Sequence, residues 1–328
     1  MFHIMPVKMK IGVIGSWSAI DPYILALRDL ENTPAICICP SGPISEHNNK
    51  YRDIDIYTEY NRLIDEVEAI VLPEQPAIHS RTVVHALKRG KHVFLYPRSV
   101  RSVSEALQFS KLAHEANVVL GVGTAGCINI NGLMEHLSNH HGIHFIDLQY
   151  HKQYTPESAN TSVSEALLVN TQIISRLVNS QVLSIKSKGI NMISGRPDII
   201  NARLEYDNGC TVNITSNMVA DHDEIHGTLV YHDRCFKYDF LSRILTSWNL
   251  HSEWDSQEVP LVVKKIEVEK RDLLTDDLTT FITSIRTGNG FNGKRDSGFD
   301  PYILTERMMD KVDRQLAVNN GKMTSNKL

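Results

Sequence analysis

The 328-residue chain lacks the features that mark secreted, membrane and nucleic-acid-binding proteins. Its five cysteines are an odd number without a CxxC pair, which favours reduced thiols in a cytoplasmic protein over a disulfide framework. No apolar run approaches the roughly 20 residues of a membrane-spanning helix, and the first residues lack a secretory signal. Lys and Arg number 34 against 38 Asp and Glu, without a basic block, so neither nucleic acid nor a membrane is an expected partner.

The hydrophobic share of 42% is that of an ordinary globular protein, and the length favours two domains. In residues 1–122, short apolar runs alternate with amphipathic stretches. The runs are typical of parallel strands buried on both faces, and they lie at residues 10–15, 35–39, 69–72, 92–95 and 118–122. This alternation predicts a Rossmann-like α/β domain with a parallel sheet.

Residues 123–328 follow a different pattern, in which isolated helices precede strands with period-2 alternation. Asn208 and Gly209 separate two such strands and are a strong hairpin signal. This half therefore predicts an α+β domain with an open, mostly antiparallel sheet. Because Val212 and Ile214 alternate with polar residues, one sheet face needs cover from helices or a second subunit, and we expect a homo-oligomer.

The first apolar run ends in a degenerate dinucleotide-binding fingerprint. The pattern G-x-G-x-x-G needs glycines for a tight turn, for close approach of a pyrophosphate and for packing of helix on strand. Residues 15–20 read GSWSAI, so only Gly15 remains and Trp17 replaces the second glycine. Residues 39–42, CPSG, also lack the acid that binds a ribose. Either NAD or NADP binds weakly here, at Gly15, Ser16 and Trp17, or the scaffold carries a remodelled loop.

Several stretches, in matching order, resemble the glucose–fructose oxidoreductase and inositol dehydrogenase family, Gfo/Idh/MocA. Lys10 to Gly15 resembles the opening strand of that family, and Pro73 with His79 resembles its Thr-Pro…His segment. Residues 90–94 (GKHVF), 224–228 (EIHGT) and 281–288 are similar to later family segments. The resemblance implies a Rossmann domain and an α+β domain whose last helix packs back on the first domain.

The resemblance also implies an oxidoreductase that moves hydride between NAD(P) and a sugar or sugar-like substrate. In the family, Pro73 and His79 would lie at the cofactor, a Lys in Glu-Lys-Pro would be catalytic, and an Asp and His would be spaced D-x-x-x-H on a helix. The chain departs from these catalytic motifs, because it reads YPR at 96–98 and has Val169 and Ile173 in place of the Asp and His.

These departures leave two hypotheses open. In the first, the protein is an oxidoreductase in which Tyr96 or His79 carries the proton. Arg98 would then orient an anionic substrate or a carbonyl, since a guanidinium is effectively never deprotonated. In the second, the protein is a catalytically silent pseudo-enzyme that serves as a ligand-binding or assembly module. Fold alone does not decide between them.

No metal site is expected. Histidines at positions 136, 140, 141 and 144 form a patch that no obvious carboxylate or cysteine completes. His222, Glu224 and His226 alternate along an expected strand, and the family resemblance explains that segment as part of the sheet. Cys37 and Cys39 share a strand face in the expected core and are interpreted as small apolar residues.

Overall fold

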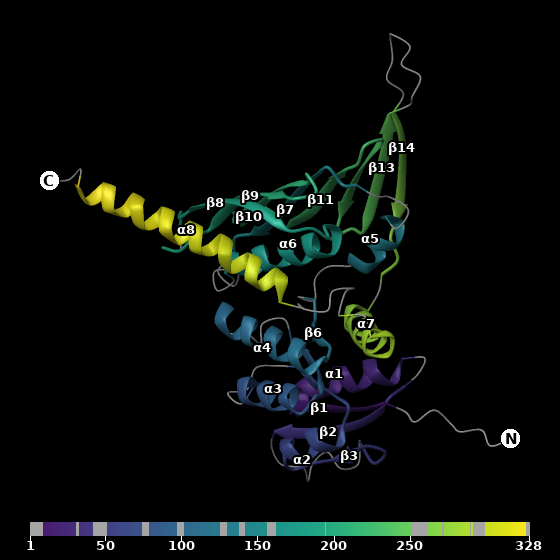
Figure 1. The fold of residues 1–328 in the computed structure, drawn as a ribbon. Coiled ribbons are helices and arrows are strands. Elements are labelled where there is room, and N and C mark those ends of the chain that lie inside the picture. Colours follow the sequence, from purple (N-terminus) through teal and green to yellow (C-terminus); the bar gives the residue numbers. More distant parts are fainter. Residues whose placement is uncertain are drawn as a thin grey trace. The chain divides into compact units, whose positions relative to one another are not determined.

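The protein folds into two compact units in a computed structural model (Figure 1). The structure describes residues 9–30, 33–41, 51–73, 79–96, 102–124, 130–137, 142–155, 162–193, 195–250, 261–270, 272–288, 290 and 299–325. The first unit combines residues 1–127 with 272–300, and the second combines 128–271 with 301–328. A helix from late in the chain therefore belongs to the first unit. The expected boundary at residue 122 and the return of the last helix to the first domain stay predictions.

The first unit contains a six-stranded parallel sheet in the order β3-β2-β1-β4-β5-β6. Its strands are β1 (Lys10–Ser16), β2 (Ala35–Ser41), β3 (Asp55–Ile56), β4 (Ala69–Leu72), β5 (His92–Leu95) and β6 (Leu120–Val122). The buried aliphatic runs of the sequence form these strands, which confirms the expected parallel sheet. The strand order reverses between β1 and β4. Sheets of this kind bind ligands at such a switch point, beyond the carboxyl ends of the strands.

Helices cover both faces of this sheet. They are α1 (Trp17–Arg28), α2 (Tyr60–Glu66), α3 (His79–Lys88), α4 (Val103–Ala116) and α7 (Leu273–Thr287). Ile11 and Val13 of β1 share a hydrophobic cluster with α1 and with Phe281 of α7. Because side chains alternate along a strand, Gly12 points to the opposite face, where Leu63 of α2 occupies the space beside it.

We predict that Gly12→Ala destabilises the first unit. The added Cβ would overlap the Leu63 side chain, and such overpacking costs about 1–3 kcal/mol. Urea denaturation of the purified protein measures the loss. Leu63→Ala removes the overlapping atoms, so the double variant should lose less free energy than the sum of the two single losses. Additive losses would contradict this explanation.

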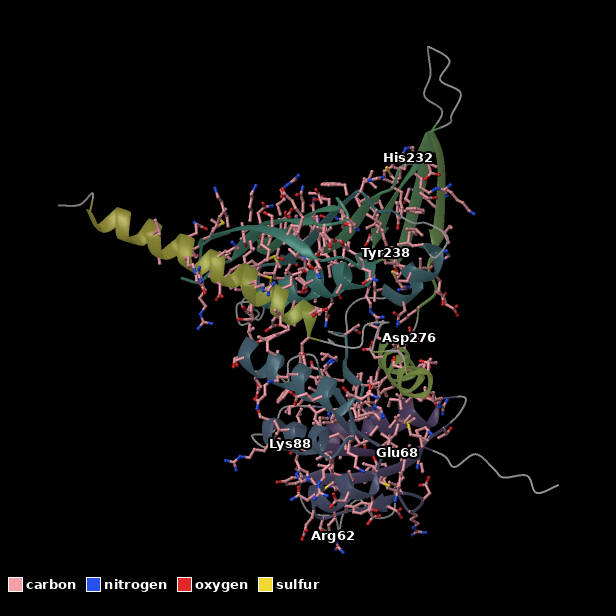
Figure 2. All side chains as sticks on the ribbon, in the orientation of Figure 1. Arg62, Glu68, Lys88, His232, Tyr238 and Asp276 are labelled. Atoms are coloured by element: carbon pink, nitrogen blue, oxygen red, sulfur yellow. The ribbon has the colours of Figure 1, made fainter. Side chains whose placement is uncertain are left out.

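A histidine links β5 to the strand beside it. The backbone N–H of Val119 donates to Nδ1 of His92, with N and Nδ1 2.9 Å apart. Burial lowers the pKa of His92, and the Glu68 carboxylate offsets part of this effect. Glu68, which precedes β4 and is labelled in Figure 2, also donates its backbone N–H to the Lys10 carbonyl. His92 therefore contributes to the fold in its neutral form, with Nδ1 as an acceptor.

We predict that His92 makes the unfolding free energy fall in acid. The folded state holds its pKa below the unfolded value, so the unfolded state takes up the proton first as the pH falls through about 6.5. His92→Asn keeps an acceptor near the Val119 N–H but does not titrate, so the decline in stability below this pH should be shallower. Denaturation at pH 5, 6 and 7 measures it, with His114→Asn at an exposed position of α4 as the matched control. An unchanged slope in His92→Asn would refute the assignment.

The second unit contains an open eight-stranded sheet in the order β14-β13-β12-β11-β7-β10-β9-β8. Its strands are β7 (Phe145–Gln153), β8 (Val182–Ile190), β9 (Ile199–Tyr206), β10 (Thr211–Ala220), β11 (Glu224–Val230), β12 (Arg234–Asp239), β13 (Ile244–Leu250) and β14 (Leu261–Glu267). Only β7 and β10 pair in parallel among these described strands, so the mostly antiparallel sheet is confirmed. The hairpin expected at Asn208 and Gly209 joins β9 to β10, and Gly209 adopts a φ of +83° there.

The helices of this unit are α5 (Ile130–Leu137), α6 (Val163–Leu177) and α8 (Asp300–Ser325). α6 lies along one face of the sheet and contacts β7, β9 and β10 (Figure 1). Val212 and Ile214 are fully buried on this face, while Asn213 and Thr215 of the opposite face are half-buried. The chain's own helix thus covers the apolar face, and the homo-oligomer stays a prediction. No helix within the described ranges is both long and apolar enough to cross a membrane.

Candidate nucleotide site at the switch point

The candidate site lies beyond the carboxyl ends of three neighbouring strands. Gly15 and Ser16 end β1 and Trp17 begins α1, while Pro73 follows β4 and Tyr96 follows β5. β4 pairs with both β1 and β5, so these segments meet at one edge of the sheet. The fold therefore brings together most of the candidate residues that the sequence indicates.

Gly15 is closely enclosed by its neighbours. A Cβ placed on it would lie 3.4 Å from Cγ of Pro73 and 3.7 Å from Cγ1 of Ile20. Pro73 is buried, and Ile20, which stands where the fingerprint has its third glycine, is fully buried in α1. The one remaining glycine is thus at a position where the backbone passes close to both β4 and α1.

The N-terminus of α1 has the features of an anion-binding site. Ser16 is the N-cap residue, but its side chain makes no capping hydrogen bond, and the first turn of α1 contains no acidic residue. The Oγ atom of Ser16 lies 3.2 Å from Oγ of Ser18. Helix N-termini carry partial positive charge and N–H groups that bind phosphates. These features fit the pyrophosphate of a dinucleotide at the end of β1.

The side chain of Trp17 contacts the segment that leads into β3. Its indole stacks on the ring of Tyr51, with centroids 5.7 Å apart and an angle of 8° between the planes. Tyr51 is 3% exposed and belongs to a hydrophobic cluster with Ile38 of β2 and Ile54 before β3. Trp17 therefore occupies the β2–β3 side of the switch point, which is the adenosine side in dinucleotide-binding sheets. On that side, the residues present do not fit a dinucleotide.

Tyr96 is the titratable side chain at the end of β5. Its backbone N–H donates to the Leu72 carbonyl at 3.0 Å, and its side chain is exposed. Burial raises the pKa of Tyr23 on α1, and the nearby Tyr96 phenol and Asp277 carboxylate of α7 add to the shift. Oδ2 of Asp277 accepts from the N–H and hydroxyl of Thr124, at 2.6 and 2.9 Å. Tyr23 and Asp277 were missed by sequence reasoning because no local pattern relates α1, α7 and β5.

The other two candidate residues are less fully described. His79 is the first residue of α3, the helix that follows β4. Arg98 and the preceding Pro97 lie outside the described residues. Tyr96 is thus the catalytic candidate whose side chain the structure describes.

The helix expected to carry the family's Asp and His is a core helix. Val169 is 5% exposed and Ile173 1%, and Asn170 one position along is fully buried. Nδ2 of Asn170 donates to Oγ of Ser216 on β10 at 3.1 Å. The Thr171 hydroxyl lies 2.9 Å from that of Thr305 on α8. The polar groups in this part of α6 therefore join the helix to the sheet and to α8.

We predict that Ser216→Ala destabilises the protein by about 1–3 kcal/mol, because the Asn170 amide loses its partner in a fully buried place. Urea denaturation measures the loss. The double variant Asn170→Leu with Ser216→Ala replaces both polar partners by apolar groups and should recover much of the free energy. A double variant less stable than Ser216→Ala would show that the pair has another role.

Three histidines of the second unit lie around the carboxylate of Glu224. Nδ1 of His226 lies 2.9 Å from Oε1 of Glu224, while His151 and His222 lie 3.8 and 3.9 Å from Oε2. Burial lowers the pKa of His226, and Lys237 lowers it further. β11 begins at Glu224, so the expected alternation of His222 along a strand is wrong. No group of three or more His, Cys, Asp or Glu in the described parts of the chain is arranged to hold a metal.

The remaining histidine patch is dispersed. His136 lies exposed at the end of α5, and His144 lies exposed before β7. Residues 140 and 141 lie outside the described ranges. The described cysteines Cys37, Cys39 and Cys210 are buried and unpaired, in agreement with the interpretation of the first two as core residues.

The strand order of the first unit defines a protein with a Rossmann-type domain. Residues 9–124 match the model of GFO_IDH_MocA, an oxidoreductase family with an NAD-binding Rossmann fold. The family resemblance of the motifs within this range is thereby confirmed. None of the curated proteins compared with the chain matches it.

Solved structures share the fold over almost the whole chain. UDP-N-acetylglucosamine 3-dehydrogenase from Acidithiobacillus ferrooxidans is 15% identical with a TM-score of 0.75, over 93% of this chain and 98% of that one. A dehydrogenase from Chromobacterium violaceum is 16% identical with a TM-score of 0.74, over 97% and 98%. A levoglucosan dehydrogenase in complex with NADH and L-sorbose is 12% identical with a TM-score of 0.71, over 93% and 97%. The chain therefore shares with these dehydrogenases the fold of a Rossmann sheet followed by an open, mostly antiparallel sheet.

Proposed function

We propose that the protein binds NAD or NADP at the switch point and acts as an oxidoreductase on a sugar or sugar-like ligand. One observation carries the proposal. α1 begins directly at the end of β1, at the switch point of a domain that matches an NAD-binding family. The names of the similar structures, which include a nucleotide-sugar dehydrogenase and a levoglucosan dehydrogenase, support a sugar-like substrate.

The residues of the switch point divide the work. Gly15, Ser16 and the first N–H groups of α1 hold phosphate oxygens. Pro73 and His79 lie at the two ends of the segment that leads from β4 into α3. A bound nicotinamide supplies or accepts a hydride. Tyr96 stands at the end of β5, where its phenol donates a proton to a reduced carbonyl or removes one from a hydroxyl. In carbonyl reduction the hydroxyl acts as the general acid.

A pseudo-enzyme is the second candidate function. It is favoured by the burial of Val169 and Ile173, because apolar core side chains cannot exchange protons with a substrate. The protein would then keep the fold as a ligand-binding or assembly module. The two functions differ in turnover but not in ligand binding.

The expected outcome is weak cofactor binding and slow turnover that depends on Tyr96. Purified protein is mixed with NADH or NADPH and a panel of keto-sugars and nucleotide sugars. Turnover is followed as the loss of absorbance of the reduced nicotinamide. Tyr96→Phe removes only the hydroxyl, and loss of a general acid lowers the rate by about 10²–10⁴-fold. Calorimetry should give the same cofactor affinity for both proteins, because Tyr96 is assigned to proton transfer.

Tyr60→Phe is the matched control and should leave turnover unchanged. Tyr60 lies on α2, which packs on the sheet face opposite to α1. Cofactor binding without any turnover would establish the pseudo-enzyme. If neither NADH nor NADPH binds, the proposal of a nicotinamide site is refuted. Turnover that Tyr96→Phe leaves intact would assign the proton transfer to another group.

A further inference from the structure

The adenosine side of the switch point is the part of the site that departs most from a dinucleotide fold. Ser16 pairs with Ser41, so the end of β2 lies beside the start of α1. In dinucleotide-binding sheets, this β1–β2 half receives the adenosine, and an acid after β2 binds its ribose. Here β2 ends with Pro40 and Ser41, and neither side chain is acidic.

The Trp17 side chain is directed into this half of the site. Cβ atoms in a helix tilt toward its N-terminus, so the side chain of the first residue of α1 starts beside the phosphate-binding end. The indole stacks on Tyr51, which precedes β3 by four residues, and β3 pairs with β2. Trp17 also packs against the hydrophobic cluster that contains Ile20, Ile38 and Ile54, and this packing holds the ring in place. A glycine would leave the same volume open.

We infer that Trp17, stacked on Tyr51, is a specificity-determining residue that fills the adenosine side of the switch point. The site therefore selects the phosphate and nicotinamide ribose of its ligand and gains little from the adenosine half. The inference rests on the proposed binding of a nicotinamide nucleotide. It assigns to Trp17 the weak dinucleotide affinity that the incomplete fingerprint predicts, with the α1 N-terminus remaining a phosphate site.

The test compares NADH with reduced nicotinamide mononucleotide, which lacks the adenosine half. Saturation-transfer NMR measures both dissociation constants for the full-length wild type, where they should agree within about threefold. Trp17→Gly should bind NADH about tenfold more tightly, while its affinity for the mononucleotide stays unchanged. A general loss of structure would weaken both ligands together, so the ratio separates specificity from stability.

Two controls accompany this comparison. Tyr51→Phe keeps the stacked ring and should keep the wild-type ratio. Trp248→Phe, on β13 of the second unit, removes a tryptophan elsewhere and should also leave the ratio unchanged. If Trp17→Gly does not fold, Trp17→Ala replaces it, and the wild-type ratio still decides.

Wild-type protein that binds NADH far more tightly than the mononucleotide overturns the inference. So does a Trp17→Gly variant with an unchanged or lower preference for NADH, while the proposed function survives in both cases. Failure of both ligands to bind the wild type and the variant overturns the proposed function and this inference together.

Discussion

The site depends on the parallel pairing of β1 with β2 on one side and with β4 on the other. Ile11, Gly12 and Val13 are paired on both sides, which places the end of β1 at the point where the strand order reverses. The chain must then turn into α1 directly above the sheet edge, because the helix begins at the residue after the strand. Every described candidate residue of the site takes its position from this arrangement.

Apolar side chains occupy several positions at which the family motifs have glycine or a polar residue. Where the nucleotide fingerprint needs bare backbone, Trp17 stacks on Tyr51 and Ile20 packs beside Gly15. In α6, Val169 and Ile173 belong to the core. Each of these apolar side chains is buried or partly buried at a position where the family motif has a ligand-binding or proton-transferring residue. The burial of these side chains contributes to the stability of the fold.

Two of the buried polar side chains hold a helix to a neighbouring segment. Asp277 holds the end of β6 through Thr124, and Asn170 joins α6 to β10 through Ser216. Such hydrogen bonds are needed because an unsatisfied buried polar group costs more than a satisfied one contributes. They tie helices to sheets within each unit. Tyr96, exposed at the end of β5, is by contrast free to meet a ligand from solvent.

The sequence by itself determined the elements of the fold. Continuous apolar runs such as 69–72 are typical of strands buried on both faces, and Asn208-Gly209 favours a hairpin through the backbone freedom of glycine. It also placed Gly15, Pro73 and Tyr96 at the carboxyl ends of strands. Only the tertiary structure decided that α7 packs beside α1, that Asp277 reaches Thr124, and that Trp17 turns toward Tyr51. These contacts join residues far apart in the chain or depend on a side-chain direction, and local periodicity contains no information about either.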